Sequence, residues 1–316
     1  MTTLFVSSVG GHLAELQHLV PRFAGIDRER LWVTFDTPQS RSMLKDENVV
    51  YVDYTRARDF KRVLRHSRVA WRMFKGRHSF SAVVSTGSGI ALSFLPIGRL
   101  RGASCHYIES ATRSVGPSMT GSLLARIPGI QLYSQYESWA RPPWKYAGSV
   151  LDAFVSGPRV SHDMIQRVVV TLGTMEDYEF RRLIERAYKV LPENAEVLWQ
   201  VGCTDVSDLP IVAHRLLPAP QLREAIEAAD VVIAHAGCGS SLGALEAGKM
   251  PVLVPRRKDL GENIDDHQAL IAAELARRQL AVVRSVEDLS AEALYMAARS
   301  SVRTTAQQAT LFQLDH

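Results

Sequence analysis

The stretch that decides the fold covers residues 230–268 and reads DVVIAHAGCGSSLGALEAGKMPVLVPRRKDLGENIDDHQ. Its apolar run, 231–234, is too short for a helix and ends at a glycine-rich turn, which is typical of a buried parallel strand. The turn at 237–241 leads into a helix, and a second apolar run, 251–254, continues through a polar loop to another helix start at 266–268. The stretch therefore predicts two parallel strands whose ends deliver polar residues to one edge of a sheet.

The turn between strand and helix is rich in glycine and hydroxyl residues: Gly237, Gly239, Ser240 and Ser241. A helix start leaves backbone N–H groups without partners and carries the positive end of the helix dipole, so a diphosphate fits there. An ordinary strand–turn–helix unit uses the same glycines for backbone geometry alone. The turn by itself leaves both interpretations open.

Short apolar runs alternate with helical segments along the rest of the chain. Further strands are expected at 4–7, 31–35, 49–52, 82–85, 104–108, 168–172, 197–201 and 212–215. Strands that alternate with helices indicate doubly wound α/β domains with parallel sheets. The pattern weakens between 137 and 166, where Trp and Pro residues interrupt it. We therefore expect two Rossmann-like domains, 1–162 and 163–316, that face a cleft.

The composition is that of an ordinary globular protein. Of the 316 residues, 46% are hydrophobic and 22% are charged, and no apolar run approaches the roughly 20 residues that a membrane span needs. The N-terminus runs straight into a strand and lacks the basic segment of a signal peptide. The three cysteines are scattered, which argues against disulfides and zinc. We therefore expect a cytoplasmic protein.

Charge is unevenly spread between the two halves. Residues 1–150 carry 20 Lys and Arg against 10 Asp and Glu, whereas residues 151–316 carry 17 against 23. A basic half joined to an acidic half suggests that the first half faces an anionic partner. No nucleic-acid recognition motif accompanies the basic half, so we expect no nucleic acid among the partners.

Motifs in both halves resemble known glycosyltransferases. His-Ala-Gly-x-Gly-Ser from His235, Gly-Lys-x-Pro-x-x-Val-Pro-Arg from Gly248 and Asp-His-Gln at 266–268 resemble the donor half of GT-B enzymes. The similarity is to the catalytic subunit of bacterial exopolysaccharide transferase pairs and of the eukaryotic dolichol-linked GlcNAc transferase, and more distantly to MurG. Ser-x-Gly-Gly-His-x-x-Glu at 8–15, with Ser85–Gly87, Tyr107–Ser110 and Ser118–Gly121, resembles their acceptor-binding, membrane-anchoring partner subunit.

The resemblance implies one chain that fuses both subunits, with the acceptor domain first and the UDP-sugar domain second. The sequence departs from this pattern because it lacks the transmembrane segment that opens the eukaryotic partner subunit. The donor site expected from it comprises Gly173, Thr174, Leu217, His235, Gly237, Gly239, Ser240, Ser241, Glu246, Arg256, Asp266, His267 and Gln268.

For several of these donor residues, both a binding role and a purely structural role are compatible with the sequence. Relatives carry a ribose-binding Glu where this chain has Gly243; Glu246 lies on the same helical face and either replaces it or is solvated. We therefore expect the ribose contact from the Asp-His-Gln motif. His235 either reaches the phosphates or is a buried structural residue. Arg256, with Arg257 and Lys258, either meets the acidic part of the donor or is solvated.

Glycosyl transfer with inversion needs a base for the acceptor hydroxyl and a group that stabilises the departing UDP. No Asp-x-Asp pair occurs in the chain, so we expect neither a metal nor another cofactor, and assign the diphosphate to the 237–241 helix start. His12 begins the first helix, where the dipole favours the neutral imidazole of a base. A capping or packing role for His12, or Glu109 as the base, stays open. Gly10, Gly11 and Ser88 are expected to bind the acceptor.

Residues 56–78 read RARDFKRVLRHSRVAWRMFKGRH and carry nine Lys and Arg against one acidic residue. Phe60, Val63, Leu64, Trp71 and Phe74 are compatible with one apolar stripe on a helix. Such a helix either packs the stripe into its own domain or docks on an anionic membrane. A polyprenyl-linked acceptor must be met at the bilayer, so we expect a peripheral protein at the inner face of the cell membrane.

The expected activity is inverting, metal-independent transfer from a UDP-sugar (GlcNAc, glucuronic acid, glucose or galactose) to a polyprenyl-diphosphate-linked acceptor, as in exopolysaccharide biosynthesis. Two other enzyme classes stay open. A UDP-sugar 2-epimerase shares this fold and nucleotide but acts without an acceptor. A nicotinamide-dependent oxidoreductase is also doubly wound, although residues 9–12 do not form Gly-x-Gly-x-x-Gly.

Overall fold

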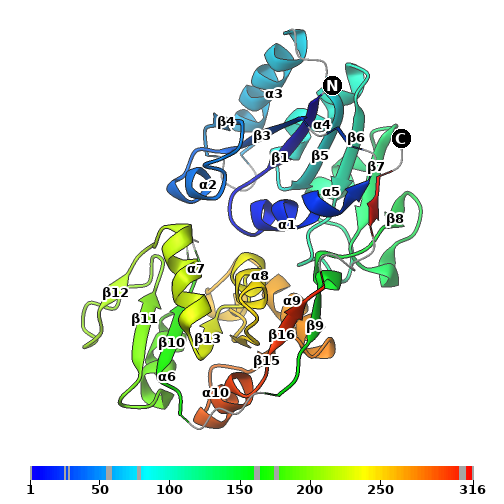
Figure 1. The fold of residues 1–316 in the computed structure, drawn as a ribbon. Coiled ribbons are helices and arrows are strands. Elements are labelled where there is room, and N and C mark those ends of the chain that lie inside the picture. Colours follow the sequence, from blue (N-terminus) through cyan, green and yellow to red (C-terminus); the bar gives the residue numbers. More distant parts are fainter. Residues whose placement is uncertain are drawn as a thin grey trace. The chain divides into compact units, whose positions relative to one another are not determined.

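The computed structural model describes residues 2–24, 26–27, 29–54, 59–76, 80–159, 164–173, 178–305 and 311–314. The chain forms two compact units, Met1–Asp152 together with Ala309–His316, and Ala153–Gln308 (Figure 1). The sequence placed the boundary ten residues later and assigned the C-terminus to the second domain. In the structure β17 (Phe312–Gln313) pairs with β2 (Phe23–Ala24), which joins the end of the chain to the first unit.

The first unit is built on a parallel sheet of seven strands in the order β4-β3-β1-β5-β6-β7-β8. The strands are β1 (Thr2–Ser7), β3 (Glu29–Phe35), β4 (Val49–Val52), β5 (Phe80–Gly87), β6 (Ser104–Ile108), β7 (Ile130–Ser134) and β8 (Trp144–Tyr146). The crossovers contain α1 (Gly11–Leu19), α2 (Pro38–Met43), α3 (Phe60–Lys75), α4 (Ala91–Leu100) and α5 (Met119–Leu124), and η1 (Val20–Arg22) extends α1. The central strand β1 is buried along its whole length, as expected for a parallel strand covered on both faces.

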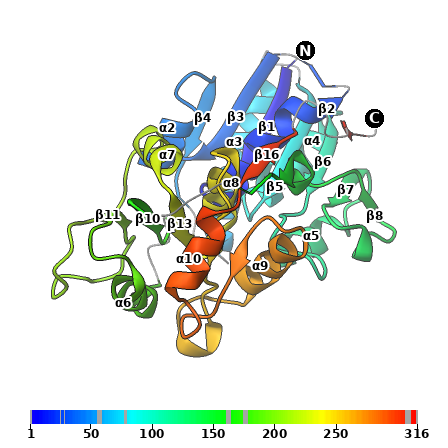
Figure 2. The same cartoon turned by 60° about the horizontal axis from the view of Figure 1, so that its bottom comes forward.

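The second unit repeats this architecture with a six-stranded parallel sheet in the order β12-β11-β10-β13-β14-β15. Its strands are β10 (Arg167–Thr171), β11 (Glu196–Gln200), β12 (Ala213–His214), β13 (Val231–Ala234), β14 (Val252–Leu253) and β15 (Val282–Val283). Its helices are α6 (Arg181–Val190), α7 (Ala219–Ala228), α8 (Cys238–Glu246), α9 (His267–Arg277) and α10 (Ala291–Ala298) (Figure 2). An antiparallel pair, β9 (Phe154–Ser156) with β16 (Val302–Thr304), completes the unit.

Both sheets confirm the expected α/β class, and each contains one reversal of strand order. In the first sheet the strand order reverses between β1 and β5, from which successive strands are added toward opposite edges. In the second sheet the order reverses in the same way between β10 and β13. Ligands of doubly wound sheets bind beyond the carboxyl ends of the strands at such a reversal. The reversals therefore direct attention to the turns after Ser7, Gly87, Thr171 and Ala234.

Helix α3 divides its apolar residues between two faces, which corrects the single stripe expected from the sequence. His66 and Ala70 are buried, and Phe74 packs its ring on Phe80 with centroids 5.0 Å apart. Leu64 and Trp71 lie instead on the outer side, where they are 58% and 40% exposed. The side chain of Phe60, and residues 55–58 and 77–79, lie outside the described part of the chain.

Candidate active site

The first turn of α8 is open to a ligand. Gly237 is the N-cap residue, and no side chain caps the helix, so the amide groups of its first turn lack intrahelical partners. Ser240 is partly exposed, whereas Ser241 is fully buried and its hydroxyl has no hydrogen-bond partner within the described residues. Amides without intrahelical partners and a buried hydroxyl without a partner at a helix start are features of an anion site.

His235 is wedged between two glycines at this edge. A Cβ on Gly173 would lie 2.5 Å from its Cε1 atom, and a Cβ on Gly237 would overlap the same ring. The Nδ1 atom lies 3.3 Å from the carbonyl oxygen of Thr171, so Nδ1 carries the proton. Burial, assisted by the charge of Arg256, lowers the pKa of the imidazole to about 3. His235 is therefore a neutral, 7% exposed residue that shapes the turn.

Gln200, which the sequence did not single out, links three strand ends. Its Nε2 donates to Thr171 Oγ1 at 3.0 Å, and its Oε1 accepts from the amide of Leu217 at 3.0 Å. The amide of Gly173 also donates to Thr171 Oγ1. The backbone at Leu217 is thus held beside the turn after β10. Thr174, another expected donor residue, lies outside the described residues.

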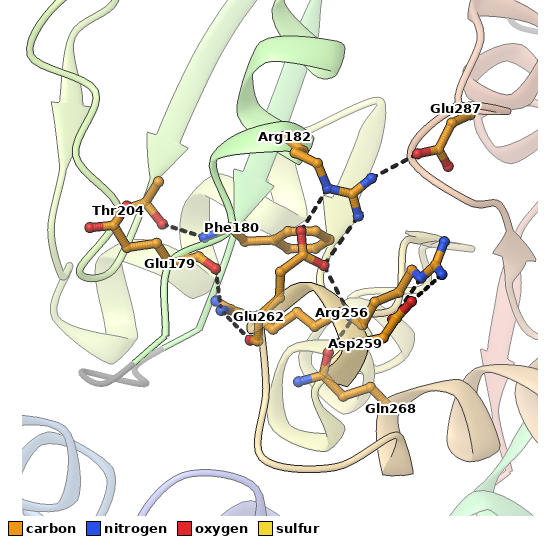
Figure 3. A network of polar contacts seen from close by, with 10 residues as sticks. Glu179, Phe180, Arg182, Thr204, Arg256, Asp259, Glu262, Gln268 and Glu287 are labelled. Atoms are coloured by element: carbon orange, nitrogen blue, oxygen red, sulfur yellow. Dashed lines mark hydrogen bonds and ion pairs between the residues drawn. The ribbon is translucent and has the colours of Figure 1, made fainter.

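Arg256 is buried rather than solvated, because only 2% of it is exposed. Its guanidinium donates to the carbonyl oxygens of Leu172 (3.2 Å) and Tyr178 (2.6 Å). It also donates to those of Glu179 (3.2 Å) and Glu262 (3.2 Å), which Figure 3 shows. Phe180 covers its face with the ring centroid 5.2 Å from Cζ. The guanidinium therefore fastens the end of β10 to the segment before α6 and to the loop before α9.

The loop before α9 is braced from both ends. The buried Glu262 carboxylate accepts from Arg182 at 2.8 and 3.2 Å and from the amide of Arg257 at 2.9 Å (Figure 3). The amide of Arg256 donates to Gln268 Oε1 at 3.1 Å. Gln268 thus presents only its NH₂ group to a ligand.

The other expected donor residues lie at different places. Asp266 precedes α9 and accepts from the amide of Lys258 at 3.1 Å, and His267 has its Nδ1 atom 2.6 Å from Asp265. Glu246 is exposed at the last residue of α8, at the opposite end from the open first turn. The structure therefore gathers Gly173, His235, Gly237, Arg256 and Gln268 around one sheet edge and leaves Glu246 apart.

His12 lies in the first turn of α1 with a defined ring orientation. Its Nδ1 atom lies 2.8 Å from the carbonyl oxygen of Thr86, and the hydroxyl of Thr86 donates to the carbonyl of His12 at 2.8 Å. A carbonyl oxygen only accepts, so in the neutral ring Nδ1 carries the proton and Nε2 holds the lone pair. Gly87 has φ +105°, and a Cβ there would lie 3.3 Å from His12 Cε1.

Glu109 is enclosed by donors. Its carboxylate accepts from the amide of Ser118 at 2.8 Å, the hydroxyl of Tyr107 at 3.2 Å and the amide of Ser110 at 3.3 Å. Burial raises the pKa of Glu109, and the Ser118 amide offsets part of that effect. Glu109 is therefore buried with its oxygens already accepting three hydrogen bonds, whereas His12 is partly exposed.

A buried network anchors the helix that carries His12. Glu15 accepts from Ser110 Oγ at 2.6 Å, from the amide of Ala111 at 3.0 Å and from Gln135 Nε2 at 3.0 Å. Gln135 Oε1 accepts in turn from the amide of Val150 at 2.7 Å, just before the division between the units. The sequence motif pointed to Glu15, but nothing local marked Gln135.

The first turn of α1 resembles that of α8. Gly10 is its N-cap residue with φ 73°, and no side chain caps the helix. Ser7, at the end of β1, is fully buried, and its hydroxyl has no partner among the described residues. Ser88 follows Gly87, the last residue of β5, and Gly87 lies against the His12 ring. Gly10, Gly11 and Ser88 therefore flank the same strand reversal.

Among the described residues, no helix combines the length and the apolar character that crossing a bilayer requires.

Comparison with known proteins places these sites in a family context. Residues 167–314 match the glycosyltransferase family 28 C-terminal domain. No protein of curated function matches the chain in sequence.

Solved structures share its fold over nearly the whole chain. MurG of Acinetobacter baumannii is 18% identical, with 98% of this chain and 93% of that chain covered and a TM-score of 0.57. The spinosyn forosaminyltransferase SpnP is 17% identical, with coverages of 99% and 93% and a TM-score of 0.60. A UDP-GlcNAc 2-epimerase from Methanocaldococcus jannaschii is 9% identical, with coverages of 99% and 96% and a TM-score of 0.56.

At these identities the structural likeness shows the fold alone, which transferases and an epimerase share. The family match distinguishes between them for the second unit. Residues 167–314 match the glycosyltransferase family 28 C-terminal domain, which supports a glycosyltransferase, and the chain has two Rossmann-like domains of the GT-B fold.

Proposed function

We propose that the chain transfers a sugar from a UDP-sugar to a polyprenyl-diphosphate-linked acceptor, with inversion and without a metal ion. The observation that carries the proposal is the first turn of α8, whose amides have no partners within the helix and no side-chain cap, together with the buried hydroxyl of Ser241, which has no partner among the described residues. These groups suit a diphosphate, because oriented N–H donors stabilise the negative charge that develops on a leaving UDP. The NH₂ group of Gln268 is proposed to contact the nucleoside, on the side where Arg256 takes its carbonyl oxygen.

His12 is proposed as the base of the reaction. Its Nε2 lone pair accepts the proton of the acceptor hydroxyl while that oxygen attacks the anomeric carbon. The bond from this carbon to the diphosphate breaks, and UDP leaves with the electron pair. The contact from Nδ1 to Thr86 keeps the ring in the tautomer that the step needs. The open start of α1, with Gly10, Gly11 and Ser88 near it, is proposed to bind the acceptor.

The outer side of α3 is proposed to dock on an anionic membrane surface. An open groove of about 300 Å³ is lined by Leu64, Ser67, Arg68, Trp71, Arg72 and Ile97. Trp71 is flanked by Lys75 and Arg101, whose charged groups lie 5.6 and 5.1 Å from its ring centroid. An exposed Trp among cations suits the interface between headgroups and acyl chains. We therefore propose a peripheral protein at the inner face of the cell membrane.

The resemblance of the two halves to separate subunits supports a further element of the proposal. We propose that one chain here does the work of an acceptor-binding subunit and a catalytic subunit. The acceptor then belongs to exopolysaccharide or related glycolipid synthesis.

Calorimetry of the full chain with UDP tests the donor site. UDP should bind in the presence of EDTA, and Ser241→Ala and Gln268→Ala should each weaken binding by about 1–3 kcal/mol. An absolute need for Mg²⁺, or unchanged affinity in both variants, would refute this site. A panel of UDP-sugars with lipid extract then identifies the donor. Conversion of the donor sugar without any acceptor would favour the epimerase instead.

A further inference from the structure

Arg256 is a buried cation whose guanidinium contacts no carboxylate among the residues that the structure describes. Within the described part of the chain its hydrogen bonds go to backbone carbonyl oxygens, and its Nε atom has no partner there. The buried carboxylate of the same network, Glu262, is occupied by Arg182 and by the amide of Arg257 (Figure 3). Carbonyl dipoles stabilise the cation, and Cys203 and Glu262 attract it from nearby without forming an ion pair with it among the described residues, so part of its field reaches the neighbouring groups.

This charge lies against the donor edge of the second sheet. One of its carbonyl partners belongs to Leu172, the residue before Gly173, and Gly173 is in contact with the ring of His235. Arg256 also contributes, after burial, to the lowered pKa of His235, so its positive charge is felt at that ring. The ring in turn touches Gly237, the N-cap residue of α8. The cation and the open helix start therefore belong to one packed cluster.

We propose that Arg256 is an electrostatic positioning residue: its buried charge adds to the positive potential at the start of α8 and stabilises the donor diphosphate without touching it. The inference rests on the proposed binding of a UDP-sugar at that helix start. A purely structural clamp would stabilise the pocket for a charged and an uncharged ligand equally. A buried charge favours the charged ligand, and this difference separates the two roles.

Calorimetry of the full chain with UDP and with uridine measures the difference. Arg256→Gln keeps a polar side chain but removes the charge, and should weaken UDP binding about ten- to thirtyfold more than uridine binding. This factor corresponds to a unit charge acting over roughly 8–10 Å at an effective dielectric constant near 20. Arg186→Gln is the matched control, because Arg186 also donates to a backbone carbonyl, that of Leu289, but lies on α6. The ratio of UDP affinity to uridine affinity in this control variant should equal that of the wild type.

A second pair of variants keeps Arg256 itself in place. The thiol of Cys203 donates to the same Tyr178 carbonyl that the guanidinium contacts, so it lies beside the cation. Cys203→Asp should neutralise the charge of Arg256 and lower the ratio of UDP affinity to uridine affinity. Cys203→Asn, whose side chain has the shape of Asp without its charge, should leave this ratio unchanged. This pair decides the question if Arg256→Gln does not fold.

Equal losses of UDP and uridine affinity in Arg256→Gln, or equal ratios in Cys203→Asp and Cys203→Asn, would overturn the inference and leave Arg256 as a structural clamp. Failure of the wild-type chain to bind UDP would instead refute the proposed function.

Discussion

Gly237→Ala tests whether the glycine at the start of α8 serves the ring of His235. The backbone of Gly237 has φ −73° and ψ 140°, which alanine adopts without strain. The obstacle is the imidazole, since a Cβ would overlap Nε2 and lie 2.7 Å from Cε1. The ring is confined on its other side by Gly173 and by the contact to Thr171. The new methyl group must therefore displace either the ring or the helix start.

Overpacking of this kind costs about 1–3 kcal/mol of unfolding free energy. Urea titration of the full chain should show that loss in Gly237→Ala, and calorimetry should show weaker UDP binding. Gly243→Ala is the matched control on the same helix, because a Cβ there meets no atom within 4 Å. It should stabilise the chain by about 0.5–1 kcal/mol through helix propensity.

The double variant Gly237→Ala with His235→Ala completes the test. If the methyl group acts through the ring, the two losses should fall short of additivity by about 1 kcal/mol or more. A Gly237→Ala chain as stable as the wild type, or strictly additive losses, would refute this reasoning about the turn.

Three further outcomes follow from buried or exposed charge. Acidification from pH 7.5 to 5 should lower the free energy of unfolding by about 2 kcal/mol through His235. The unfolded chain takes up a proton on this imidazole, whereas in the folded chain its pKa of about 3 keeps it neutral. Urea titrations of His235→Asn should lack this part of the pH dependence. Gln135→Leu should lower stability by roughly 1–3 kcal/mol, because a buried carboxylate and an amide lose their partner, and should leave UDP affinity unchanged; wild-type stability would contradict the network. Replacing Arg65, Arg68 and Arg72 with Glu should abolish sedimentation with anionic liposomes while a soluble acceptor analogue is still glycosylated; undiminished sedimentation would place the docking surface elsewhere.

The sequence predicted the parts of the fold that are locally determined. The expected strands around 4–7, 82–85 and 231–234 are β1, β5 and β13, because each is a short buried apolar run ended by a glycine or serine turn. Among the strands of the two main sheets, β7, β8 and β15 were missed; β8 lies in the Trp- and Pro-rich stretch where the pattern weakens. β7, Ile130–Ser134, mixes polar and apolar residues, and β15 has only two residues, so neither carries a period that can be counted.

The candidate site shows the same limit. His12 and the 237–241 turn could be located because their motifs are contiguous in sequence. Arg256 could not be separated from Arg257 and Lys258, since its burial depends on carbonyl oxygens up to 84 residues away. Gln135 likewise depends on Glu15, 120 residues distant. The apolar residues of α3 were grouped wrongly because sequence spacing does not say which face the neighbouring α4 covers.

The identity of the base tests the proposed chemistry most directly. Acceptor-dependent transfer by the full chain should fall about 10²–10⁴-fold in His12→Ala, while UDP affinity stays near that of the wild type. Such a split is expected because His12 lies in the first unit and is proposed to contact the acceptor hydroxyl rather than the donor. Turnover that survives in His12→Ala but collapses in Glu109→Gln would contradict the account and transfer the role of base to Glu109.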